Sequence, residues 1–85
     1  MNQSGMDEEM KHFLLGLFDA VEADVSAKAS LYEIGEALGM ERDRANFIAT
    51  ELIGFGYAEI KTLSGGLGIT EDGLAAAREM GAGDD

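Results

Sequence analysis

The residues that most often carry catalysis are scarce in this chain. It has one histidine, His12, and no cysteine, so a histidine-based triad with a metal site, a thiol nucleophile and a thiolate metal site are all excluded. Residues 64–68 (SGGLG) have the glycines of a phosphate-binding loop but lack its Gly-Lys-Ser/Thr ending. With 17 acidic residues among 85, neighbouring carboxylates such as those of residues 7–9 arise by chance. We therefore expect no enzyme, no metal site and no cofactor.

Charge restricts the partners of this chain. Six basic and 17 acidic residues give a formal net charge of −11. This charge repels phosphate backbones and anionic membranes at long range. Three interpretations of the acidity stay open: an ordinary solvated surface, a partner with a basic face, or a host that lives in high salt. The scarcity of lysine and the abundance of alanine and glycine are compatible with the third interpretation.

Length and hydropathy predict one domain without a membrane segment. The 85 residues leave room for one core, and 46 % of them are apolar, which is typical of a globular chain. We expect a single domain over residues 1–85, with its core at about 7–80 and disordered tails at 1–5 and 81–85. There is no run of 18 apolar residues, and residues 1–9 are acidic where a signal peptide is basic. These features favour a cytoplasmic protein.

The first predicted element is a helix over about residues 7–23. Ser4 followed by Asp7 is similar to a capping box. Apolar residues recur at spacings of three and four, which places them on one helical face: Met10, Phe13, Leu14, Leu17, Phe18 and Val21. His12 falls on the opposite flank, where a solvated side chain is expected.

Two further helices follow, separated by a very short turn. A capping box at Ser30 begins a helix over about residues 31–38, and Leu31 could also belong to a very short strand. The next helix covers residues 41–54. Only Gly39 and Met40 separate the two, which predicts a steep crossing. Their expected inward residues are Ile34, Ala37, Leu38, Ala45, Ile48, Ala49 and Leu52.

After Gly56 the pattern changes to a hairpin and a last helix. The side chains of residues 57–62 alternate with period two, which predicts a strand. Residues 64–66 form a turn, and residues 67–69 are the short returning strand of a hairpin. Thr70 then caps a helix with Leu74, Ala77 and Met80 on its inner side.

This order of elements resembles a winged helix-turn-helix domain. Residues 34–40 (IGEALGM) are similar to its first helix and glycine turn, and residues 52–57 (LIGFGY) to the end of its recognition helix. Residues 69–74 (ITEDGL) are similar to the Leu-Thr-x-x-Gly step that closes the wing in bacterial regulators of the MarR and PadR type. The expected fold is mainly α with a small β-hairpin: a three-helix core, a wing and a C-terminal helix.

The resemblance implies double-stranded DNA binding in transcriptional regulation by a small bacterial or archaeal protein. Helix 41–54 would lie in the major groove, with the wing at residues 61–68 assisting. Arginine binds guanine edges and asparagine adenine edges in bidentate fashion. The candidate DNA-binding residues are Arg42, Arg44, Asn46, Thr50, Lys61 and Ser64.

Acidic and apolar residues on the same elements favour an alternative. Glu41, Asp43 and Glu51 share the helix with the arginines. If only Arg42, Arg44 and Lys61 contacted phosphates, the logarithm of the DNA affinity would fall against the logarithm of the salt concentration with a slope of only about −3. Three apolar residues stand where charged ones are common in such regulators: Phe47, Ile53 and Phe55.

That alternative is an acidic winged helix that binds protein and not DNA. If two or more of Phe47, Ile53 and Phe55 are exposed together, they form an apolar patch of the kind that marks a protein interface. The alternative also includes self-association. In that case the first helix pairs with the same helix of a second copy, through the flank that carries Met6 and Leu15.

Overall fold

Four helices and a small sheet make up the computed structural model, which describes residues 7–82. The elements follow one another as α1 (Glu8–Ala20), β1 (Ala29–Ser30), α2 (Leu31–Ala37), α3 (Arg42–Phe55), β2 (Ala58–Thr62), β3 (Gly66–Ile69) and α4 (Glu71–Glu79). A mainly helical fold with a small hairpin is thereby confirmed. None of the helices in residues 7–82 is long and apolar enough to cross a membrane. The proposed roles of Ser4 and Met6 lie outside the described residues.

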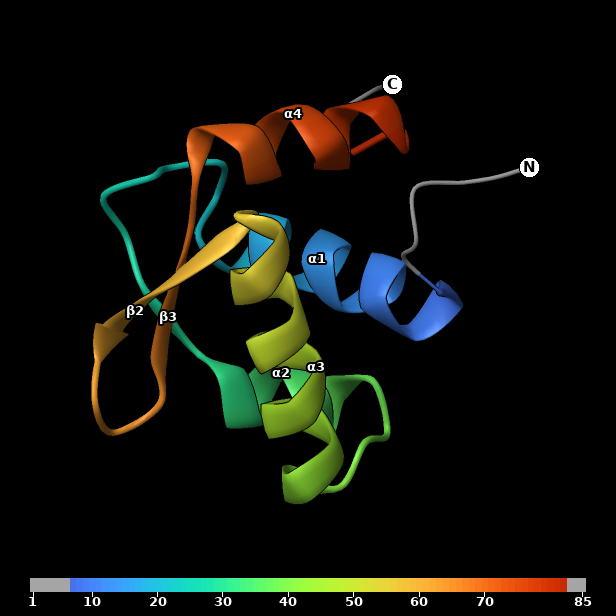
Figure 1. Ribbon diagram of the computed structural model, residues 1–85, viewed down its shortest axis with the longest axis vertical. Helices are drawn as coiled ribbons and strands as arrows, with labels where there is room; N and C mark the ends of the chain where they lie inside the picture. Colours follow the sequence, from blue (N-terminus) through green and yellow to red (C-terminus); the bar gives the residue numbers. More distant parts are fainter. Residues whose placement is uncertain (1–6, 83–85) are drawn as a thin grey trace.

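The sheet has three antiparallel strands in the order β1-β3-β2. β2 and β3 form the hairpin, which extends to one side of the helices (Figure 1). Ala58 pairs with Ile69 and Ile60 with Leu67, and the register then shifts between Ile60 and Thr62. The short strand near Leu31 is present, but it consists of Ala29 and Ser30, and Leu31 is the first residue of α2.

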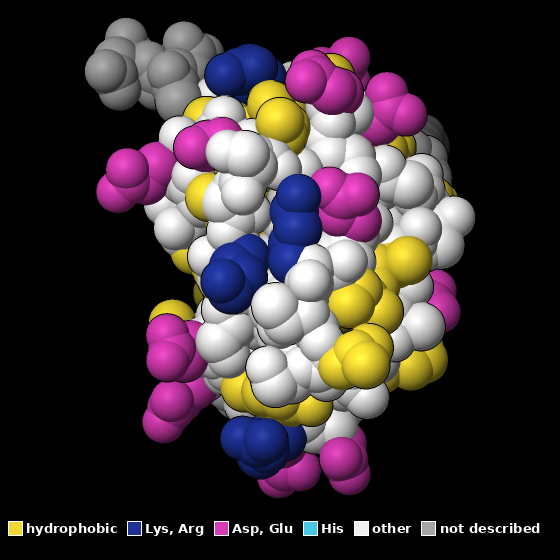
Figure 2. Space-filling view, turned by 90° about the vertical axis from the view of Figure 1, so that its left-hand side faces the viewer, with side chains coloured by type: hydrophobic (Ala, Val, Ile, Leu, Met, Phe, Trp, Pro, Cys, Tyr) yellow, Lys and Arg dark blue, Asp and Glu magenta, His cyan; other side chains and the backbone are white. Residues whose placement is uncertain are grey.

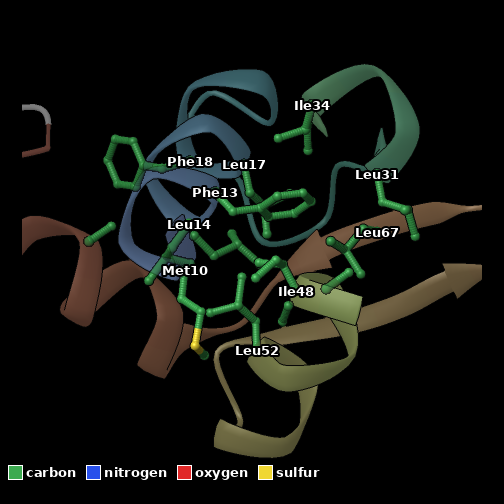
Figure 3. Packing of buried hydrophobic residues seen from close by; sticks show 14 of the residues in the cluster. Met10, Phe13, Leu14, Leu17, Phe18, Leu31, Ile34, Ile48, Leu52 and Leu67 are labelled. Atoms are coloured by element: carbon green, nitrogen blue, oxygen red, sulfur yellow. The ribbon is translucent and has the colours of Figure 1, made fainter. Parts of the chain in front are cut away.

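The core lies between α1, α3 and the inner face of the sheet (Figure 3). All six apolar residues predicted for the inner face of the first helix are buried, as are the four predicted for the third. Leu67 and Ile69 of β3 close the core from the sheet side and are 0 % exposed. No polar or charged residue is buried among residues 7–82. Removal of apolar surface from water is therefore the main stabilising term of this fold.

The second helix was predicted with too many inward residues. Ile34 is buried, but Ala37 is exposed and Leu38 is 39 % exposed. Ala37 and Leu38 line a hollow between α2 and α1, beside Gly16, which has no side chain to cover them. In the last helix the predicted pattern holds, since Leu74 and Ala77 are buried and Met80 is half-buried against the core.

All four helices end in the same backbone motif. A residue at or directly after the C-cap adopts a positive φ, and two backbone N–H groups then bond back to carbonyls of the last turn. This residue is a glycine in three of the helices: Gly39 and Gly81 follow the C-caps of α2 and α4, and Gly56 is itself the C-cap of α3. After α1 it is Glu22, with φ 55°, and Ala23 follows with φ 59°.

This motif corrects one predicted end. α1 stops at Ala20 and not at Ala23, because Glu22 and Ala23 leave the right-handed region. At the end of α4, Gly81 and Ala82 bond back to Arg78 and Ala77, and residues 83–85 of the predicted tail lie outside the described residues. At the other end of α1, the cap is Asp7 itself, whose carboxylate accepts from the Met10 amide at 2.9 Å.

Two glycines allow close approaches between elements. A Cβ on Gly35 of α2 would lie 2.5 Å from Cβ of Ala45, so the helices α2 and α3 touch at this point with almost no side chain between them. A Cβ on Gly73 of α4 would collide with the carbonyl oxygen of Tyr57, at the base of the hairpin. These contacts fix the position of α3 and of the hairpin relative to the other helices.

Candidate functional site

The exposed part of α3 has two flanks and an outward stripe. Its inner face is buried through Ala45, Ile48, Ala49 and Leu52. One flank faces the hairpin and carries Arg42, Asn46, Thr50 and Ile53, which are spaced by three or four residues along one side of the helix. The opposite flank faces α1 and carries Arg44. The two arginines therefore point to different sides of the same helix.

A shallow groove separates the hairpin-facing flank of α3 from the hairpin. Its volume is about 120 Å³. Asn46, Thr50 and Ile53 line it from the helix, and Ile60, Thr62 and Leu63 line it from the hairpin. Thr50 uses its hydroxyl within the helix, where Oγ1 donates to the Asn46 carbonyl at 2.9 Å. Asn46 is exposed, and its side-chain amide is one of the polar groups of the groove.

Arg42 lies at one end of this groove, on the ring of Tyr32. The guanidinium carbon is 3.9 Å from the ring centroid, which is a cation–π geometry. Tyr32 in turn packs against Gly65 in the hairpin turn, where any Cβ would lie 2.8 Å from its ring. Arg42 makes no salt bridge with an acid of residues 7–82.

Arg44 is already bound to an acid on another helix. Its Nε donates to the Glu9 carboxylate of α1 at 2.8 Å, and Nη2 contacts the same oxygen. This hydrogen bond raises the pKa of Arg44 further above its ordinary value. Its guanidinium carbon also lies 5.3 Å from the ring centroid of Phe47. Arg44 is therefore not a free cation for a partner on the hairpin side.

Lys61 lies on the outer face of the sheet, away from the groove. Its chain covers Gly68 of β3, and its Nζ is 3.1 Å from the Glu59 carboxylate. Figure 2 views the molecule from the hairpin side and shows dark blue cations near the centre with an acidic side chain directly beside them, hydrophobic side chains to one side, and further cations at the top and bottom edges. Ser64 is in the hairpin turn, with its Oγ 3.3 Å from Oγ1 of Thr62, and that Oγ1 accepts from the Gly66 amide.

The six candidate DNA-binding residues therefore do not form one surface. Asn46 and Thr50 share the groove, and Arg42 lies at its end on Tyr32. Ser64 is beyond the other wall, in the turn of the hairpin. Arg44 and Lys61 are elsewhere, each in contact with a carboxylate.

The three candidate interface residues are also separated. Phe47 is 52 % exposed on the outward stripe, beside Arg44. Ile53 is half-buried in the groove. Phe55 is 40 % exposed and stacks on Tyr57, with 5.7 Å between the ring centroids, near α4. Phe47 and Phe55 are both exposed, but they do not form one continuous patch.

The two most exposed of the large apolar side chains were missed by the sequence analysis. Leu63, at the hairpin turn, is 100 % exposed, and Ile60 is 60 % exposed. The period-two pattern placed Ile60 on the same side as Ala58, which is buried. The hairpin extends past the core, so Ile60 faces the groove instead. An apolar residue directly before the turn residues 64–66 was the available signal for Leu63.

The proposed self-association flank of α1 is only partly free. Leu15 is half-buried and packs against the core. His12 is exposed, as expected, with Nε2 3.9 Å from the Glu8 carboxylate. Residues 7–82 contain no group of three or more side chains that could hold a metal ion.

Comparisons with known proteins add no assignment: the chain matches no family model, no curated protein and no solved structure.

Proposed function

We propose that this chain is a winged helix-turn-helix domain that binds a protein partner through α3 and the hairpin. The order of the elements, the short connection of residues 38–41 between α2 and α3, and the hairpin before α4 support the winged-helix assignment. In this interpretation α3 is the recognition helix and β2–β3 is the wing. The fold alone does not specify the partner, so the function is argued from the surface.

The single observation that carries the proposal is the apolar end of the wing. Leu63 is 100 % exposed and Ile60 is 60 % exposed, and both line the groove beside α3. Transferring one such side chain from water into an interface is favourable by about 1.5–3 kcal/mol. An isolated exposed leucine is common, but here two large apolar residues border a groove that also contains Ile53. A partner that inserts an apolar side chain there buries all three.

The charges on this surface favour protein over nucleic acid. Of the cations near this surface, Arg44 and Lys61 already contact Glu9 and Glu59. Arg42 and Lys28, whose side chain reaches Gly66 of the hairpin, remain as phosphate contacts, so the log–log salt slope of duplex binding is only about −2. The net charge of −11 adds long-range repulsion of any phosphate backbone.

DNA is the second candidate function, and one flank of α3 favours it. Arg42, Asn46 and Thr50 lie along the side of the recognition helix that faces the wing. Arginine and asparagine are the side chains that read guanine and adenine in the major groove. This candidate requires Arg42→Ala and Asn46→Ala to weaken duplex binding.

The experiment that tests the protein hypothesis is site-specific photocrosslinking in the host cell. A photoreactive residue at Asn46, which is exposed and lines the groove, is expected to yield one discrete crosslinked protein, whereas the same residue at Asp19, on the exposed side of α1, yields none. Adding Leu63→Asp to the Asn46 probe is expected to abolish that product without changing stability, because Leu63 makes no buried contact. A product that survives Leu63→Asp and Ile60→Asp together contradicts the proposed surface.

A duplex titration separates the two candidates directly. Labelled protein is titrated with mixed-sequence duplex DNA at low salt and followed by NMR. The protein hypothesis predicts no shifts at Asn46, Thr50 and the hairpin. Shifts confined to those residues, lost in Arg42→Ala and fading with salt, would overturn it in favour of DNA.

A further inference from the structure

A second hollow lies at the far end of α3, away from the groove of the proposed function. Its volume is about 380 Å³. One wall is the aromatic pair Phe55 and Tyr57, whose rings are stacked with 10° between their planes. The other wall is a single stripe of α4.

The α4 stripe has a carboxylate at each end and methyl groups between. Asp72, Ala75, Ala76 and Glu79 follow the spacing that places residues on one side of a helix. Asp72 and Glu79 are seven positions apart, which at about 1.5 Å of rise per residue places their backbones roughly 10 Å apart along the helix. The floor is therefore apolar, and both ends are anionic.

No cation of the described chain neutralises these two acids. Neither Asp72 nor Glu79 forms a salt bridge within residues 7–82. Arg78 is the nearest basic residue along α4, but its guanidinium carbon lies 5.6 Å from the ring centroid of Phe18. The hollow therefore combines two open carboxylates with an exposed aromatic ring.

We propose that this hollow binds an arginine or lysine side chain of a partner protein. Such a side chain has an apolar stem and a cationic head, which correspond to the alanine floor and the terminal carboxylates. The cationic head is attracted to the face of Phe55 or Tyr57 and, at the same time, to the carboxylate at one end of the stripe. Arginine fits best, because a planar guanidinium both stacks on a ring and donates two hydrogen bonds to one carboxylate.

This inference does not depend on the groove at the hairpin. Phe55 and Tyr57 belong to the segment that joins α3 to β2, and the remaining residues belong to α4. A partner that occupies both surfaces would carry an apolar residue and a basic residue at separate points. Either surface can bind while the other does not, so each is tested on its own.

The test is an NMR titration of the whole protein with N-acetyl-arginine amide at low salt. The uncharged isostere N-acetyl-citrulline amide serves as the matched ligand control. Arginine amide is expected to shift Phe55, Tyr57, Asp72 and Glu79 with a dissociation constant in the millimolar range, and citrulline amide is not. Asp72→Asn combined with Glu79→Gln is expected to weaken binding at least tenfold.

The control variant removes the same kind of charge from the same helix. Glu71→Gln lies on α4 outside the hollow and is expected to change the affinity less than twofold. Phe55→Leu keeps an apolar side chain but removes the ring, and is expected to weaken arginine amide several-fold. Equal shifts with citrulline amide, shifts spread over all acidic surfaces, or an unchanged affinity in the double variant would overturn the proposal.

Discussion

Arg44 on α3 and Glu9 on α1 form a hydrogen-bonded ion pair across 35 positions of sequence, with Nε 2.8 Å from the carboxylate. The contact occupies a guanidinium that the sequence would otherwise assign to a partner. It also links the recognition helix of the proposed winged helix to α1.

Releasing Arg44 is expected to make the surface more attractive to phosphate. In Glu9→Gln the guanidinium loses its carboxylate partner, so one more cation can contact a duplex. We expect the log–log slope of non-specific DNA binding against salt to steepen by about one. Fluorescence anisotropy with labelled duplex at several salt concentrations measures this slope. Glu8→Gln removes the same charge without touching Arg44, and an equal change in slope there would contradict the argument.

The residue that ends α1 is expected to be replaceable with a gain in stability. Glu22 has φ 55°, a region in which glycine has no steric cost and other residues do. We expect Glu22→Gly to raise the free energy of unfolding by about 0.5–1 kcal/mol, measured by urea denaturation. Gly56→Ala is the reverse change in the same motif after α3 and is expected to lower it by about 1 kcal/mol. A loss of stability in Glu22→Gly would show that contacts of its side chain dominate.

α4 packs so closely against the base of the hairpin that we expect no side chain to be tolerated at position 73. A Cβ there meets the carbonyl oxygen of Tyr57, which belongs to the backbone and cannot rotate away. We expect Gly73→Ala to lower the free energy of unfolding by about 1–3 kcal/mol, the usual cost of overpacking. Gly54→Ala is the matched control, since nothing lies within 4 Å of its added Cβ. It sits in α3 and is expected to stabilise the protein by up to about 1 kcal/mol.

Removing the hydroxyl of Thr70 is expected to lower the stability of the fold more than removing any other hydroxyl. Its Oγ1 accepts from the Gly73 amide at 2.9 Å and donates to the Gly56 carbonyl at 2.6 Å, so it joins the ends of two helices. We expect Thr70→Ala to lower the free energy of unfolding by about 1–2 kcal/mol. Thr50→Ala removes an exposed hydroxyl that bonds only within its own helix, and is expected to cost less than about 0.5 kcal/mol. Thermal denaturation of both variants under one condition makes the comparison.

The features that could be predicted from sequence are those that depend on local spacing. Met10, Phe13, Leu14 and Leu17 were placed on one face by intervals of three and four, and all are buried. Gly39 and Gly56 marked helix ends because glycine tolerates a positive φ. The end of α1 was missed because Glu22 and Ala23 adopt a positive φ although neither is a glycine, so their residue types do not indicate a helix end.

The candidate site depended on contacts that local patterns do not contain. The spacing of Arg42 and Arg44 already indicates different flanks of a helix. Nothing local indicates that Glu9 is the partner of Arg44, because that contact depends on how α1 crosses α3. The exposure of Ile60 likewise depends on where the hairpin leaves the core. Tertiary packing, and not residue type, decides which of these side chains a partner can reach.

The contact between Gly35 and Ala45 limits how this domain could respond to a signal. α2 and α3 meet there at backbone distance, next to a connection of only a few residues. Reorienting one helix against the other would open a void or create a clash, and packed interiors resist both. The two helices must therefore move as one rigid body. Any regulation of this domain would act by covering its surfaces or by moving the whole unit, and not by changing the angle between these helices.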